Sequence, residues 1–139
     1  MMFAARMQHI EEVILPALSD GIHVVSDRFT DATFAYQGGG RGMPSEDIEI
    51  LEHWVQGGLK PDLTLLLDVP LEVSMARIGQ TREKDRFEQE QADFFMRVRG
   101  VYLDRAAACP ERYAVIDSNR NLDEVRNSIE KVLDGHFGC

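Results

Sequence analysis

The chain has 139 residues and a formal net charge of −9 at pH 7, from 24 acidic residues against 15 lysines and arginines. This length accommodates one domain with a sizeable core, and the acidic charge argues against a general electrostatic attraction to nucleic-acid polymers. The sequence has no apolar run of the roughly 18 residues that a membrane span needs, so we expect no membrane partner. Two distant cysteines, Cys109 and Cys139, make neither a disulfide framework nor a zinc site. They fit a reducing cytosol, and we expect a cytoplasmic protein.

The first third of the chain begins with a helical signal. Apolar residues at helical spacing predict a helix over residues 1–18, which Pro16 kinks or shortens. Residues 22–26 predict a short strand that ends at Asp27. The three glycines at 38–40 predict a flexible break.

The middle of the chain contains the strongest strand signal. Ser45 is a suitable N-cap for a helix that Gly57 and Gly58 end. Residues 63–69 form a nearly continuous apolar run, as is typical of a strand that is covered on both faces. Pro70 then suits the first position of another helix.

The last third alternates between polar and apolar segments. Residues 80–86 predict a loop, residues 87–108 a long helix, and residues 113–116 a third strand. Asn121 with Glu124 resembles a capping box and opens a last helix, which the sequence predicts to end at Gly135. The alternation predicts an α/β fold with a parallel sheet in a single domain over residues 1–139. Because three strands are few for such a sheet, we expect the domain to be incomplete at its N-terminus.

The segment Asp27-Arg28-Phe29 is the first site with chemical meaning. It follows a predicted strand, and ligands of open α/β sheets bind outside the carboxyl ends of strands. A guanidinium placed there binds phosphate oxygens in a bidentate fork. The alternative is a solvated strand end with a local ion pair.

The longer run DRFTDATFAYQGGGRG, residues 27–42, resembles the DR(Y/F/H) motif of thymidylate kinases and the AYQGGGRG stretch that follows it in many bacterial members. Residues 85–102 resemble the lid loop and following helix of the same family, with the lid at about residues 79–87. Phe3-Ala4-Ala5-Arg6, near the start of the chain, resembles a third segment of the same family. The resemblance covers essentially the whole chain, and it implies a P-loop-kinase-like three-layer α/β fold with transfer of the ATP γ-phosphoryl group to dTMP, giving dTDP.

The resemblance also implies roles for individual residues. Arg28 and Arg6 are expected to bind the phosphate of dTMP, and Phe3, or Met2 in another register, to stack on thymine. Thr33 and Gln37 match positions near the base, where polar pairing discriminates more sharply than apolar contact. Core packing is the alternative role of Phe3. The implied dTMP-binding set is Phe3, Arg6, Arg28, Thr33, Tyr36 and Gln37.

Catalysis and ATP binding are expected elsewhere. Arg82 and Arg86 are candidates to neutralise charge on the transferred phosphoryl group, with Lys84 as a third candidate and a solvated charge run as the alternative. Asp27 is expected to orient Arg28, to reach Mg²⁺ through water, or to form a simple ion pair. The resemblance implies ATP with Mg²⁺ as the substrate complex, no metal site of the chain's own, and a homodimer. The residues expected beside adenine are Arg77, Asn119 and Arg120.

The sequence contains no G-x-x-x-x-G-K-[ST] motif. Without the amides and the lysine of that loop, the β- and γ-phosphates of ATP have no clamp. We therefore expect this loop upstream and expect the chain alone to be inactive. Two other hypotheses remain: an inactive nucleotide-binding and dimerisation module, and a kinase of another nucleotide acceptor.

Overall fold

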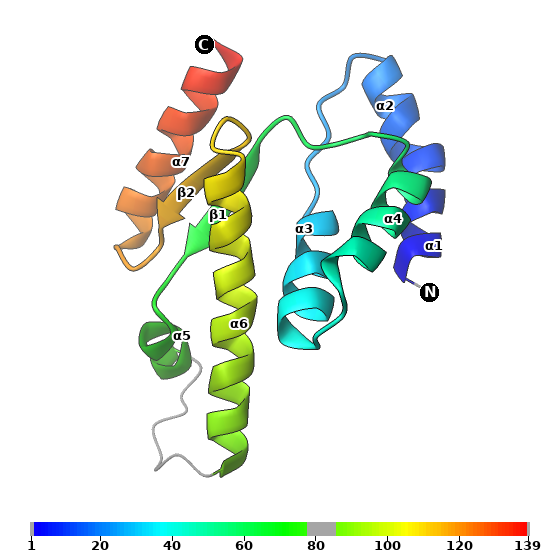
Figure 1. Cartoon of the computed structure of the whole chain (residues 1–139). Coiled ribbons are helices and arrows are strands. Elements are labelled where there is room, and N and C mark those ends of the chain that lie inside the picture. Colours follow the sequence, from blue (N-terminus) through cyan, green and yellow to red (C-terminus); the bar gives the residue numbers. More distant parts are fainter. Residues whose placement is uncertain (1, 78–85, 139) are drawn as a thin grey trace. The chain divides into compact units, whose positions relative to one another are not determined.

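The computed structural model describes residues 2–77 and 86–138. The chain divides into two compact units, Met1–Lys60, here called unit 1, and Pro61–Cys139, here called unit 2 (Figure 1). Within the described residues, no helix is both long and apolar enough to cross a membrane. The expectation of a single domain stays a prediction.

Unit 1 begins with a helical segment in three parts: α1 (Met2–His9), the π-helical η1 (Ile10–Ile14) and α2 (Leu15–Ser19). The π-helical stretch lies directly before Pro16, which has no N–H to donate and therefore interrupts regular α-helical bonding. Ile10 and Ile14 are buried, as the helical spacing requires. The predicted helix is confirmed. It continues past Pro16 to Ser19, so Pro16 does not shorten it, and the kink at Pro16 stays a prediction.

The strand predicted over residues 22–26 is wrong. In the described part of the chain, the only strands are those of a two-stranded sheet in unit 2. Ile22 and Val25 are instead 57% and 97% exposed. An apolar segment becomes a strand only when a neighbouring strand pairs with its backbone. No described strand pairs with residues 22–26, and the Ile22 N–H donates instead to the carbonyl oxygen of Ala17 at 2.9 Å.

The predicted break at the three glycines is also wrong. The short helix α3 (Thr30–Thr33) continues into the π-helical η2 (Phe34–Gly40), which includes all three. A Cβ atom at Gly38 would lie 3.3 Å from Cδ1 of Ile48, a fully buried side chain of α4 (Ser45–Gln56). Gly38 thus permits close packing of η2 against α4.

The ends of α4 follow the sequence signals in part. Its N-cap is Pro44, so Ser45 is the first helical residue and the predicted N-cap is displaced by one position. At the other end, Gly57 has φ 56°, the left-handed conformation that glycine adopts at the end of a helix. This C-terminal prediction is confirmed.

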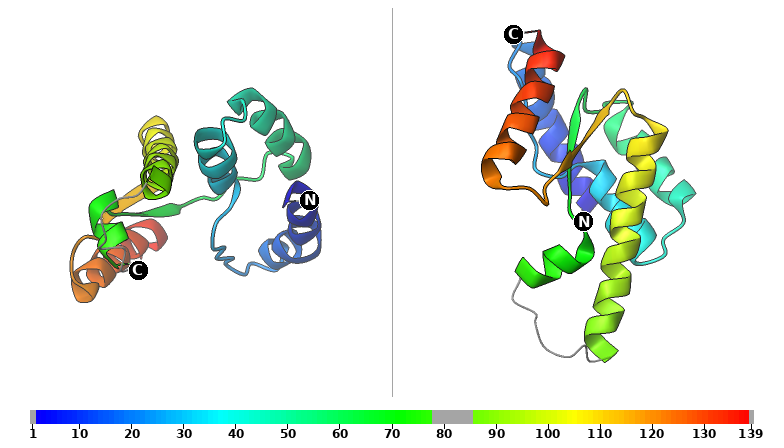
Figure 2. Two further views of the ribbon diagram at one scale, coloured as in Figure 1. Left: turned by 90° about the horizontal axis from the view of Figure 1, so that it is seen from below. Right: turned by 90° about the vertical axis from the view of Figure 1, so that its left-hand side faces the viewer.

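Unit 2 is built on a parallel pair of strands. β1 (Thr64–Asp68) pairs with β2 (Tyr113–Asp117), with Thr64 opposite Tyr113 and Asp68 opposite Asp117. The connection includes α5 (Leu71–Arg77) and α6 (Arg86–Ala108), and α7 (Leu122–Phe137) follows β2. Helices α6 and α7 lie on opposite sides of the sheet (Figure 2). This unit confirms the predicted parallel sheet.

Two details of unit 2 differ from expectation. β1 was expected to be covered on both faces, yet Leu67 is 53% exposed, so the face of β1 on which Leu67 lies is only partly covered. Helix α7 opens with the predicted capping box, in which the Glu124 N–H donates to Asn121 Oδ1 at 2.9 Å. It continues past the predicted end at Gly135 to Phe137, and Gly138, with φ 69°, is its C-cap.

Candidate functional site

The predicted acceptor-side residues lie in unit 1, and Arg6 connects two of its helices. Nη2 of Arg6, on α1, donates to Oγ1 of Thr33, the last residue of α3, at 3.1 Å. The Arg6 guanidinium carbon lies 5.1 Å from the ring centre of Phe3 and 5.5 Å from that of Phe29. Cation–π attraction to both rings therefore holds the guanidinium beside Thr33.

One nitrogen of Arg6 has no partner. Among the described residues, Nη1 is a buried side-chain polar atom with no hydrogen bond. Burial lowers the pKa of Arg6 from its usual value, while the carboxylates of Glu52 and Asp31 act in the opposite direction. A buried N–H donor without an acceptor is costly, so this atom marks a place where a ligand acceptor would be stabilising.

Arg28 follows the segment that was expected to be a strand. Its φ of 64° makes it the one non-glycine residue with positive φ in the described part of the chain, a conformation that costs energy and recurs at functional sites. Its guanidinium carbon lies 5.3 Å from the ring centre of Tyr36, on η2. The Ser26 hydroxyl donates to the Arg28 carbonyl oxygen at 3.2 Å and supports this turn.

Gln37 and Asp27 are the two remaining predicted residues on the acceptor side. Gln37, next to Tyr36 on η2, accepts a hydrogen bond at Oε1 from Nη1 of Arg41 at 3.2 Å. Asp27 is exposed and, within the described residues, forms no ion pair with Arg28, so the simple ion pair considered from the sequence is absent. The structure thus brings Arg6 to Phe3 and Thr33, and Arg28 to Tyr36.

The residues expected beside adenine gather in unit 2 at the loop after β2. Arg77, the last residue of α5, donates from Nη2 to the carbonyl oxygen of Ser118 at 3.1 Å. Ser118 in turn donates from its N–H and its hydroxyl to the carbonyl oxygen of Asp68, at 2.8 Å each. This chain of bonds places Arg77 against the loop that carries Asn119 and Arg120.

Asn119 and Arg120 both bond to the carboxylate of Asp117. The Asn119 N–H donates to Oδ1 at 3.0 Å and Arg120 Nε to Oδ2 at 3.1 Å. These two bonds, the one from Arg120 first, lower the pKa of Asp117 from its usual value. Both bonds are local, and they join the start of this loop to the end of β2.

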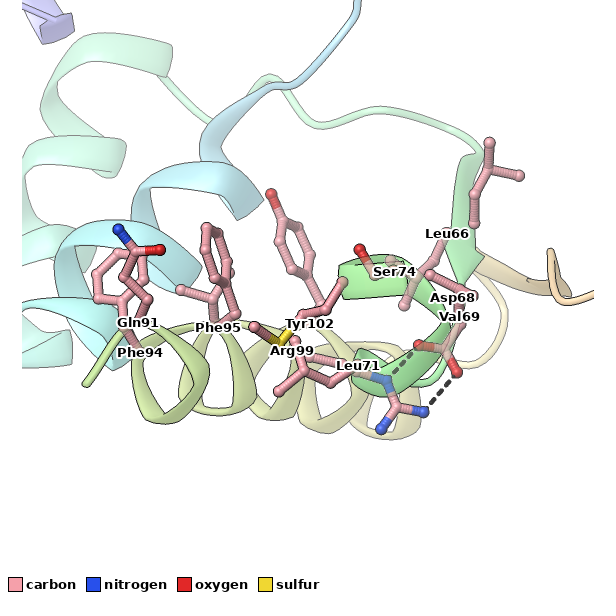
Figure 3. A pocket seen from close by; sticks show the side chains of 13 residues that line it. Leu66, Asp68, Val69, Leu71, Ser74, Gln91, Phe94, Phe95, Arg99 and Tyr102 are labelled. Atoms are coloured by element: carbon pink, nitrogen blue, oxygen red, sulfur yellow. Dashed lines mark hydrogen bonds and ion pairs between the residues drawn. The ribbon is translucent and has the colours of Figure 1, made fainter. Parts of the chain in front are cut away.

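The carboxyl end of β1 carries a strong ion pair that the sequence did not predict. Arg99, on α6, donates from Nε and Nη2 to the two carboxylate oxygens of Asp68, at 2.6 and 2.8 Å (Figure 3). This bidentate bond raises the pKa of Arg99. The pair borders an apolar groove of about 680 Å³ between β1, α5 and α6, which none of the predicted site residues lines.

The lid predictions cannot be placed. Arg82 and Lys84 lie outside the described residues, and Arg86 begins α6 with a side chain that also lies outside them. In the part of the chain that the structure describes, no three His, Cys, Asp or Glu side chains are grouped to hold a metal ion.

Sequence reasoning missed several buried or paired polar residues. Thr30, Asp31 and Gln56 are buried in unit 1, and no local pattern distinguishes them. Asp68 could have been found, because it ends the strongest predicted strand, where ligands of α/β sheets bind. Its partner Arg99 is 31 positions away and depends on how α6 packs.

Comparison with known proteins finds thymidylate kinases, by family model, by sequence and by structure. The thymidylate kinase family model matches residues 1–129. The chain is 98% identical over all its 139 residues to a thymidylate kinase of Neisseria gonorrhoeae, of which it covers 68%. It is 59% identical over 133 residues to a thymidylate kinase of Cupriavidus necator, covering 96% of this chain and 66% of that protein. A crystal structure of thymidylate kinase from Ehrlichia chaffeensis superposes with a TM-score of 0.74 at 30% identity, covering 95% of this chain and 60% of that one.

The fold is α/β with a parallel sheet, of the kind that P-loop kinases have. The chain belongs to the thymidylate kinase family. This confirms the family and the class of activity predicted from the sequence, a nucleoside monophosphate kinase acting on dTMP. The chain spans about two thirds of the length of the relatives it matches.

Proposed function

We propose that the complete protein transfers the γ-phosphoryl group of ATP to dTMP and that unit 1 of this chain binds dTMP. The observation that carries the proposal is the buried, unpartnered Nη1 of Arg6, beside Thr33 and two aromatic rings. A flat pyrimidine fits beside such rings, and its carbonyl oxygen supplies the acceptor that Nη1 lacks. Arg28 binds the phosphate group in this proposal.

The geometry favours a different role for Arg6 than the one expected from the sequence. Because Nη2 already bonds Thr33, which matches a position near the base, the free Nη1 belongs at the base edge and not at the phosphate. Thymine presents a carbonyl at C4, where cytosine presents an amino donor. The buried donor of Arg6 therefore selects thymine over cytosine in this proposal.

On the ATP side, we propose that Arg77, Asn119 and Arg120 border the adenine. Their support is the hydrogen bond from Arg77 to Ser118 and the two local bonds to Asp117. Arg82 and Arg86 are proposed to stabilise the transferred phosphoryl group. On the acceptor side, Asp27 is proposed to act near Arg28. Tyr36 is proposed to lie beside the sugar and Gln37 near the base. ATP would arrive with Mg²⁺, and a cytoplasmic homodimer is proposed from the family resemblance.

Nucleotide titration tests the proposal on a complete protein. We define the completed enzyme as this chain extended with the residues of the Neisseria gonorrhoeae relative that lie outside the match. Calorimetry should give a dTMP dissociation constant at least about tenfold lower than that of dCMP, since one mispaired buried donor costs about 1–3 kcal/mol. Equal affinity for dTMP and dCMP, or preference for dGMP, would contradict the proposed acceptor.

A further inference from the structure

The buried polar side chains of the molecule are concentrated around one short helix. Among the described residues, four polar or charged residues are buried: Thr30, Asp31, Thr33 and Gln56. The first three lie on α3, and Gln56 is the last residue of α4. Burying polar groups costs free energy unless they are hydrogen-bonded, and satisfied buried networks fix one arrangement of a core.

The position of helix α3 depends on its contacts with the rest of unit 1. It has four residues, and its N-cap, Phe29, makes no side-chain capping bond. Even together with η2, the helical segment over residues 30–40 is shorter than the roughly 12–15 residues below which isolated helices are marginal, so its position depends on contacts with its neighbours. One hydrogen bond at each end of α3 joins it to another helix of unit 1.

The bond at the C-terminal end is the one from Arg6 to Thr33, described above. At the N-terminal end, the Thr30 hydroxyl donates to Oε1 of Gln56, and both side chains are buried. The same Gln56 donates from Nε2 to the carbonyl oxygen of Leu59 at 3.0 Å, which fixes its amide plane after the end of α4. The amide therefore presents its oxygen to α3 in one orientation.

We propose that Gln56 is a positioning residue for nucleotide recognition: through Thr30 it sets the placement of α3, and through α3 the placement of Thr33 and Arg6 at the base. This inference rests on the proposed function of unit 1. Gln56 contacts no ligand in this account. It acts because the hydrogen bonds run without interruption from Leu59 through Gln56 and Thr30 to α3, and from α3 to the Arg6 side chain.

The test compares variants that differ in single hydrogen bonds, all in the completed enzyme. In Gln56→Met, which keeps the length of the side chain but removes its amide, the dTMP dissociation constant should rise about tenfold, the effect of leaving one buried hydroxyl unpaired. The dTMP-to-dCMP selectivity should fall with it, while the KM for ATP should stay within about twofold, because only acceptor binding is affected. Thr30→Val should weaken dTMP binding as Gln56→Met does, and Thr30→Ser, which keeps the hydroxyl, should restore it.

The matched control is Val55→Ala, at the buried neighbour of Gln56 on α4. It should lower the melting temperature without changing dTMP affinity or selectivity. The Thr30→Val, Gln56→Met double variant should bind dTMP no more weakly than either single variant, because the two residues share one bond.

The outcomes separate the two claims. If the unsubstituted completed enzyme does not bind dTMP, the proposed function fails and the inference fails with it. If that enzyme binds dTMP while Gln56→Met and Thr30→Val only lower the melting temperature, as Val55→Ala does, the positioning role alone is refuted.

Discussion

In the completed enzyme, Arg28→Ala should raise the dTMP dissociation constant about 100-fold. The reason is the loss of a charge-assisted, bidentate contact to the phosphate group, which is worth more than a neutral hydrogen bond. Calorimetric titration with dTMP measures the loss directly. Titration with thymidine, which has no phosphate, should show little difference between Arg28→Ala and the unsubstituted enzyme.

The backbone at Arg28 requires its own control, because φ is 64° at this position. Glycine adopts positive φ without cost, whereas alanine does not. Arg28→Gly should therefore be more stable than Arg28→Ala, by about 1 kcal/mol in chemical denaturation, yet bind dTMP equally poorly. If Arg28→Gly bound dTMP normally, the guanidinium would have no role in phosphate binding.

The second large effect is expected from Arg6→Lys. Lysine keeps the positive charge but lacks the planar fork with which Arg6 reaches Thr33 and offers Nη1 between Phe3 and Phe29. The dTMP dissociation constant should rise about 30-fold, from the loss of two hydrogen bonds in a buried setting, and the preference for dTMP over dCMP should largely disappear.

The control for this substitution is Arg126→Lys on α7. Arg126 is exposed and pairs with Glu130 at 2.8 Å, so the same exchange there should leave dTMP binding unchanged. Weaker dTMP binding by Arg6→Lys with unaltered selectivity against dCMP would place Arg6 at the phosphate, as the family resemblance first suggested.

The elements that the sequence predicted correctly depend on local signals. The capping box at Asn121 and Glu124, the left-handed end of α4 at Gly57, and the long helix α6 each follow from residues within a turn or two of one another. Local hydrogen bonds and side-chain spacing decide these features, so they are readable without a structure.

The failures concern features decided by distant partners. The apolar segment at residues 22–26 has strand composition, but a strand exists only where another strand pairs with it. The glycines at 38–40 look flexible in isolation, yet Gly38 packs against Ile48, ten positions away on α4.

The residues of the candidate site also fall into those that a local motif predicts and those that depend on distant partners. Arg28 and the residues around it were found by family resemblance to a contiguous motif, which needs no knowledge of packing. The bonds from Thr30 to Gln56 and from Arg99 to Asp68 join residues 26 and 31 positions apart. No local pattern encodes such pairs, so they appear only once the helices are in place.

The kinase activity of the protein is tested most directly by dTMP-dependent release of ADP from ATP and Mg²⁺, measured on the completed enzyme and on this 139-residue chain alone. We predict clear turnover that saturates with dTMP for the completed enzyme. We predict none for the chain alone, whose sequence contains no G-x-x-x-x-G-K-[ST] loop to clamp the ATP phosphates. Absence of dTMP-dependent turnover by the completed enzyme would contradict the proposed function, and turnover by the chain alone would show that residues within it hold the donor phosphates.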